Sequence, residues 1–143
     1  MNSFTIGIND NEQLTLTVLD YERSPVGDFF DDNWLICEVS IRAGAFRGKF
    51  RANLLTSELE ELHRELRILH DGLQGNYTFE PLEGQLILRI SCNNLGHFQI
   101  NGEAMDQAGI GHRLVFKFSL DQTYLCTALE ELSNLIQAFP VRT

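Results

Sequence analysis

The fold is decided by residues 34–54, WLICEVSIRAGAFRGKFRANL, in which apolar and polar residues alternate on both sides of Gly44. A period of two puts successive side chains on opposite faces of a strand, so each half of this stretch predicts a strand with one buried face. Gly44 allows the tight turn between them, and the two strands therefore form an antiparallel hairpin. The side chains expected to point inward are Leu35, Cys37, Val39, Ile41, Phe46, Phe50, Ala52 and Leu54.

The same alternation recurs on both sides of this hairpin. It predicts strands over residues 4–8 and 14–18, and later over 76–80, 85–92, 95–104 and 112–121. Leucines at helical spacing predict a helix over 57–71, with Ser57 and Glu60 as a capping box and Gly72 at its end. A second apolar stripe follows Asp121, which we expect to cap a C-terminal helix that Pro140 stops.

These elements together indicate an α+β fold. About eight strands joined by short turns form a mainly antiparallel sheet, either in two layers or strongly curved. Two amphipathic helices, one central and one C-terminal, complete the pattern. The length of 143 residues fits a single domain over residues 1–143.

The acidic composition limits the classes of partner. The formal net charge is -9 and the isoelectric point about 4.8. Such a surface repels phosphate backbones and anionic headgroups, so we expect no nucleic acid and no membrane as partner, and a basic protein instead. The cysteines Cys37, Cys92 and Cys126 form no CxxC pair, and residues 1–10 show no secretory pattern. Both observations favour a cytoplasmic location.

No group of residues in the sequence predicts a catalytic centre. The motifs HExxH, GxSxG and GxGxxG do not occur, and the histidines lack metal-ligand spacing. We expect no metal and no cofactor, and we expect His63 and His70 at the surface. Cys92, His97 and Asp106 contain the groups of a nucleophilic site, but nothing in their spacing requires one. The sequence therefore favours a protein that is not an enzyme.

Acidic residues mark a candidate partner-binding surface in two segments, the loop predicted over 22–33 and the first helix. They are Asp28, Asp31, Asp32, Glu58, Glu61 and Glu65. Complementary charge steers a basic partner into contact, so these carboxylates are expected to speed association. In the same loop we expect Phe29 and Phe30 to pack against the core, with a role as binding anchors as the alternative.

Several short phrases occur together in the second part of the chain. They are NWL at 33–35, AFRGKF at 45–50, LEGQL at 82–86, GH at 96–97, DQAGIG at 106–111, LDQTYL at 120–125 and FPVR at 139–142. From about Trp34 to the C-terminus the chain thereby resembles the WapI family of bacterial immunity proteins. The resemblance implies a small cytoplasmic antitoxin that binds the toxic C-terminal domain of a contact-delivered polymorphic toxin. Such a protein blocks the toxin by occlusion, without turning over a substrate.

A second class of function stays open from the residues themselves. A curved antiparallel sheet also suits a module that binds a small molecule or a peptide in a pocket. This alternative requires a large apolar cavity, for which Phe46, Phe50, Phe116 and Phe118 are the expected lining.

Overall fold

The computed structural model describes residues 2–143, and within them it has eight strands and two α-helices. The first sheet contains β1 (Ser3–Asn9), β2 (Glu12–Tyr21), β3 (Trp34–Ala43) and β4 (Phe46–Leu55). The second sheet contains β5 (Gly75–Phe79), β6 (Leu86–Cys92), β7 (His97–Met105) and β8 (Arg113–Asp121). The helices are α1 (Thr56–Gly72) and α2 (Gln122–Ala138), and a 3-10 turn, η1 (Asp31–Asn33), precedes β3.

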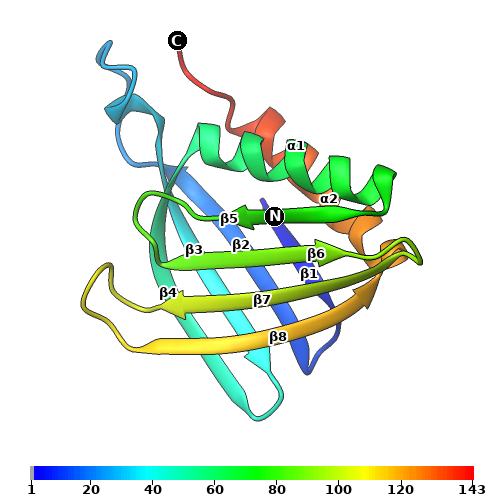
Figure 1. Ribbon diagram of the computed structural model, residues 1–143. Coiled ribbons are helices and arrows are strands. Elements are labelled where there is room, and N and C mark those ends of the chain that lie inside the picture. Colours follow the sequence, from blue (N-terminus) through cyan, green and yellow to red (C-terminus); the bar gives the residue numbers. More distant parts are fainter. Residues whose placement is uncertain (1) are drawn as a thin grey trace.

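Both sheets are antiparallel meanders, with the orders β1-β2-β3-β4 and β5-β6-β7-β8. They form two layers whose strands cross obliquely, and α1 and α2 lie along one side of the pair (Figure 1). The expected α+β class is confirmed. Of the two sheet arrangements left open, the two-layer one is correct, and the sheets are not closed into a barrel.

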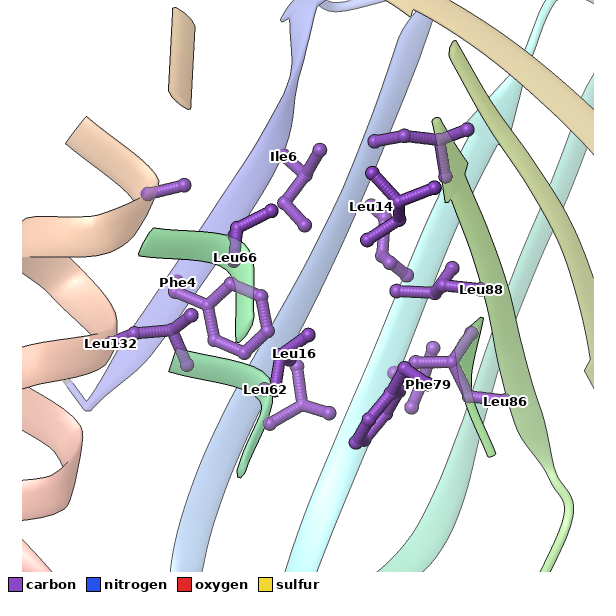
Figure 2. Packing of buried hydrophobic residues seen from close by; sticks show 14 of the residues in the cluster. Phe4, Ile6, Leu14, Leu16, Leu62, Leu66, Phe79, Leu86, Leu88 and Leu132 are labelled. Atoms are coloured by element: carbon purple, nitrogen blue, oxygen red, sulfur yellow. The ribbon is translucent and has the colours of Figure 1, made fainter. Parts of the chain in front are cut away.

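The core lies between the two sheets and the two helices. Apolar side chains from β1, β2, β5, β6 and both helices converge there (Figure 2). Those labelled in the figure are Phe4, Ile6, Leu14, Leu16, Leu62, Leu66, Phe79, Leu86, Leu88 and Leu132. The order of the chain explains this arrangement, because α1 links β4 of one sheet to β5 of the other and α2 returns from β8 to pack on β1.

Helix α2 also covers an edge of the first sheet. The Thr5 N–H group on the edge strand β1 donates to the Glu131 carboxylate of α2 at 3.0 Å. An edge N–H that is satisfied in this way is no longer available to pair with another strand.

Gln85, just before β6, links the two sheets directly. Its side-chain amide donates to the Arg51 carbonyl of β4 at 3.0 Å and to the Met105 carbonyl of β7 at 3.2 Å.

The hairpin of residues 34–54 forms as predicted, with one correction. Leu35 pairs with Leu54 and Cys37 with Ala52, and these four side chains are buried. Phe46, expected to point into the core, is 66% exposed. It pairs with Ala43 beside the turn, at the end of the strand, where it lines an open groove instead of the packed interior.

The helix ends also differ from the prediction. The capping pair Ser57 and Glu60 is wrong, because α1 starts earlier and the Leu55 N–H group donates to the Glu58 carboxylate at 2.7 Å. At the other end Gly72 is the last helical residue as predicted, although the left-handed position belongs to Leu73, whose φ is 52°.

The expected cap of the C-terminal helix fails as well. Asp121 occupies the position before α2, but its side chain makes no capping hydrogen bond. The Gln122 N–H group instead donates to the Gly96 carbonyl at 2.9 Å. A backbone group from the β6–β7 turn therefore satisfies one N–H group of the first turn, and sequence spacing does not reveal it.

Candidate functional site

The loop between β2 and β3 is built around a buried carboxylate. Asp32, whose side chain is 6% exposed, accepts hydrogen bonds from the N–H groups of Val26 and Gly27 and from the Arg23 guanidinium. Burial opposes ionisation of Asp32, but these hydrogen bonds outweigh it and lower the pKa of the carboxyl. Asp32 therefore ties residues 23, 26 and 27 to the end of the loop, and its charge is satisfied inside the loop.

A buried asparagine fastens the same loop to the end of the chain. The Asn33 amide group donates to the carbonyls of Phe29 and Arg142. Its side-chain oxygen accepts from the Thr56 hydroxyl at 2.8 Å and from the Arg142 N–H group at 2.7 Å. Asn33 thus joins the loop, the start of α1 and the C-terminal tail at one point.

The C-terminal tail closes over the base of the loop. The Arg142 guanidinium lies 3.4 Å from the centre of the Tyr21 ring and donates to the Arg23 carbonyl at 2.9 Å. The Tyr21 hydroxyl in turn donates to the Pro140 carbonyl at 2.6 Å. Burial raises the pKa of Tyr21 despite the nearby Arg142 charge, so the hydroxyl keeps the proton that it donates.

Apolar side chains stand out from this braced loop. Val26 is 72% exposed, Phe29 58% and Phe30 51%, and we call these three residues the apolar tip. The expectation that Phe29 and Phe30 pack against the core is wrong. The interior of the loop is filled by the polar groups around Asp32 and Asn33, so the rings are left outside.

A groove adjoins the apolar tip. It has a volume of about 440 Å³ and is lined by Glu22, Arg23, Asp31, Trp34, Asn53 and Glu83. The Phe30 ring packs edge-on against Trp34, with centroids 6.0 Å apart, and so connects the tip to the groove. Leu82, next to Glu83, is 67% exposed. The surface as a whole combines an apolar centre with a mainly acidic rim.

The six acidic residues expected to bind a partner fall into three groups. Asp28 and Asp31 are exposed on the loop, and Asp31 lines the groove. Asp32 is buried, and both oxygens of Glu58 bind backbone N–H groups, those of Leu55 and Leu82. Glu58 thereby ties the β5–β6 connection to the start of α1, beside the groove.

Glu61 and Glu65 lie farther along α1, facing β5. The Tyr77 hydroxyl donates to Glu61 at 3.2 Å. Burial and the nearby charges of Glu61 and Glu65 raise the pKa of Tyr77. These two carboxylates extend the acidic surface along the helix, away from the apolar tip.

Sequence reasoning missed four members of this surface: Val26, Trp34, Leu82 and Glu83. Trp34 and Glu83 come together only because β3 and the β5–β6 connection meet at one end of the molecule. The adjacent pair Phe29–Phe30 within an acidic, glycine-containing loop was the available signal, and the exposure of both rings agrees with the binding-anchor alternative, which stays a prediction.

The other candidate chemistry is dispersed by the fold. His97 begins β7, whereas Asp106 follows its end and accepts from the His112 N–H group, so Cys92, His97 and Asp106 form no single site. His63 and His70 are half-buried between elements, contrary to the expected surface positions. Among residues 2–143 no three His, Cys, Asp or Glu side chains are grouped to hold a metal ion. No helix of the described chain is long and apolar enough to cross a membrane.

The four phenylalanines expected around an apolar cavity are also separated. Phe116 and Phe118 are buried and pack on each other with centroids 5.0 Å apart. Phe46 and Phe50 line an open groove of about 310 Å³ that also includes Arg47, Lys49 and Arg113. The core between the sheets is thus filled by side chains at the place where the pocket was expected.

Comparison with known proteins gives one family. The family described as "Immunity protein WapI-like family" matches residues 5–140. This match includes residues 5–9 of β1, all of β2 and the loop of residues 22–33, which lay outside the resemblance noticed in the sequence. No curated protein matches the chain.

Proposed function

This chain belongs to the WapI-like immunity protein family, and we propose that it binds a cognate toxin domain and neutralises it by occlusion. The protein acts by occupying a surface of the toxin and turns over no substrate. We place this action in the bacterial cytoplasm, where the toxin would meet its target. The toxin is the C-terminal domain of a larger secreted protein in this proposal.

The apolar tip is the observation that carries the binding proposal. Exposed aromatic side chains at the centre of an interface supply much of the binding free energy of protein complexes. Here Phe29 and Phe30 stand on a loop that is already held by Asp32 and Asn33. A loop held in its bound conformation loses little entropy on association, so more of the contact energy appears as affinity.

The acidic rim supports a basic partner. Asp28, Asp31 and Glu83 surround the tip and groove, and Glu61 and Glu65 continue the charge along α1. A basic surface on the toxin domain complements this arrangement and would be attracted to it before contact. Asp32 and Glu58 contribute indirectly, because they position the loop and the groove wall.

Co-expression tests the proposal directly. The toxin domain encoded beside this gene is expressed in a host cell with and without this protein, and survival and co-purification are scored. We expect rescue and a stable complex. Death of the co-expressing cells together with failure of the two purified proteins to associate would reject the toxin domain as partner.

Paired variants locate the interface. A phenylalanine side chain presents ~200 Å² of surface, and Phe29 exposes 58% of it. Burying that area in a complex contributes ~2–3 kcal/mol, so Phe29→Ala should raise Kd by ~30-fold or more. Phe46→Ala is the matched control, because Phe46 is 66% exposed and starts β4, whereas the apolar tip lies near the end of β4, where Leu55 pairs with Trp34. An equal rise in Kd for the two variants would show that the apolar tip is not the centre of the interface.

A further inference from the structure

Cys126 forms a side-chain cluster that lies apart from the apolar tip. It is exposed on the second turn of α2, and its Sγ atom lies 3.3 Å from Nε2 of His70 near the end of α1. Nδ1 of His70 lies 2.9 Å from the Asp71 carboxylate. Thiol, imidazole and carboxylate are therefore in contact in that order.

Each neighbour in this cluster has a definite chemical role. The Asp71 carboxylate accepts the Nδ1–H proton, which leaves Nε2 free to accept a proton from the thiol. The hydrogen bond from His70 is the main reason that the pKa of Asp71 is lowered, so the carboxylate is ionised and accepts the proton on Nδ1. This is the arrangement that activates a nucleophile: a base beside it and an orienting group behind the base.

A hydrogen bond from the Gln122 side chain fixes the distance between the two helices at this point. The Gln122 amide, in the first turn of α2, donates to the His70 carbonyl at 2.7 Å. The imidazole is only 17% exposed, which restricts its rotation. The Gln122–His70 hydrogen bond and the burial of the imidazole thus place His70 beside Cys126.

The thiol is open to a small reactant. A groove of about 340 Å³ beside it is lined by Arg67, His70, Asp71, Cys126, Leu129, Glu130 and Ser133. The charged groups that line it are Arg67 and Asp71 from α1 and Glu130 from α2, and the Arg67 guanidinium pairs with the Asp71 carboxylate at 3.5 Å.

The other two thiols have different surroundings. Cys37 is fully buried, and burial raises its pKa to about 12. Cys92 donates to the Asn93 carbonyl at 3.2 Å, and burial raises its pKa as well. Only the thiolate is a strong nucleophile, so both of these cysteines are poorly reactive at neutral pH.

We propose that Cys126, assisted by His70 and Asp71, is a reactive thiol that undergoes thiol–disulfide exchange with small disulfides. The Cys126 proton passes to Nε2 of His70, and the sulfur attacks one sulfur of the disulfide. A new S–S bond forms at Cys126 while the old one breaks, and the leaving thiolate takes the proton from the imidazole. Cys126 is oxidised and the departing half of the disulfide is reduced, which makes this site a redox-responsive modification site on the helical layer.

The rate of reaction with oxidised glutathione, followed by intact mass, tests the proposal. A free thiol is only a few per cent ionised at pH 7, so a base can raise the reactive fraction substantially. The accompanying loss of nucleophilicity reduces the net gain to about fivefold. We expect the adduct on Cys126, its loss in Cys126→Ser, and a reaction about fivefold slower in His70→Gln at pH 7.

The pH dependence separates activation from a merely structural role. At pH 10 thiols ionise without help, so wild type and His70→Gln should then react at similar rates. The reaction rate of Asp71→Asn at pH 7 should lie between those of wild type and His70→Gln. His112→Gln is the control, because His112 is an exposed histidine beside the Asp106 carboxylate, at the opposite end of β8 from α2. An equal loss in His70→Gln at both pH values, or an adduct mainly on Cys92, would overturn the proposal.

Discussion

Replacement of Asn33 by alanine tests whether the loop is braced as the contacts indicate. The side chain is 3% exposed and makes hydrogen bonds with Phe29, Thr56 and both backbone groups of Arg142. Each such bond contributes about 1 kcal/mol net, so the loss of four costs ~4 kcal/mol. For a chain of this size that corresponds to a fall in Tm of ~10 °C or more.

The matched control is Asn53→Ala. Asn53 is half-buried, whereas Asn33 is buried, and its amide makes one hydrogen bond, to the Leu35 carbonyl at 3.3 Å, so we expect a loss of about 1 kcal/mol. Urea unfolding gives the two free energies, and amide hydrogen exchange of residues 24–32 reports local opening. Exchange should quicken in Asn33→Ala and stay unchanged in Asn53→Ala. Similar stability losses in the two variants, with no change in loop exchange, would refute the bracing role.

Three further predictions follow from local contacts. Gly102→Ala should cost 1–3 kcal/mol, because a Cβ atom there would overlap the Phe116 ring, and adding Phe116→Leu should recover part of the loss in urea unfolding. His63 is held neutral because burial, followed by the Arg67 charge, lowers its pKa. Stability should therefore fall as the pH drops below 6.5, by at most ~1.4 kcal/mol per pH unit, and His63→Leu should flatten that part of the curve. Asp28→Asn with Asp31→Asn should slow association with the toxin domain severalfold in stopped flow at low salt, with little effect at high salt.

Alternation of residue types was sufficient to predict most of the sheet. In β3 the period of two ran without interruption, and Leu35, Cys37, Val39 and Ile41 are all buried as predicted. The same rule failed for Phe46, because it specifies the face of a strand but not how far the opposite layer extends. The helix caps failed for a related reason, since backbone groups from distant turns can replace the expected side chains.

The candidate site was harder to predict because its decisive contacts are long-range. Asn33 and Arg142 are 109 residues apart, and nothing in either neighbourhood indicates that they meet. Asp32 was classed with the surface acids by its type and position, although its charge is enclosed by the loop. Composition identified an acidic segment correctly, but which carboxylates face solvent depended on the folded loop.

The distribution of charge gives the molecule a preferred orientation towards a basic partner. Seven of its eleven basic residues lie on strands, namely Arg42, Arg47, Lys49, Arg51, Arg89, Arg113 and Lys117. Some of their charge is balanced locally, as where Glu103 bridges Arg89 and Arg113 at 2.9 and 3.4 Å. Most acids lie instead on the helices and on the loops at the end that carries the apolar tip. A basic surface would therefore be attracted towards the helices and these loops more than towards the strand faces, and the apolar tip lies within that acidic part of the molecule.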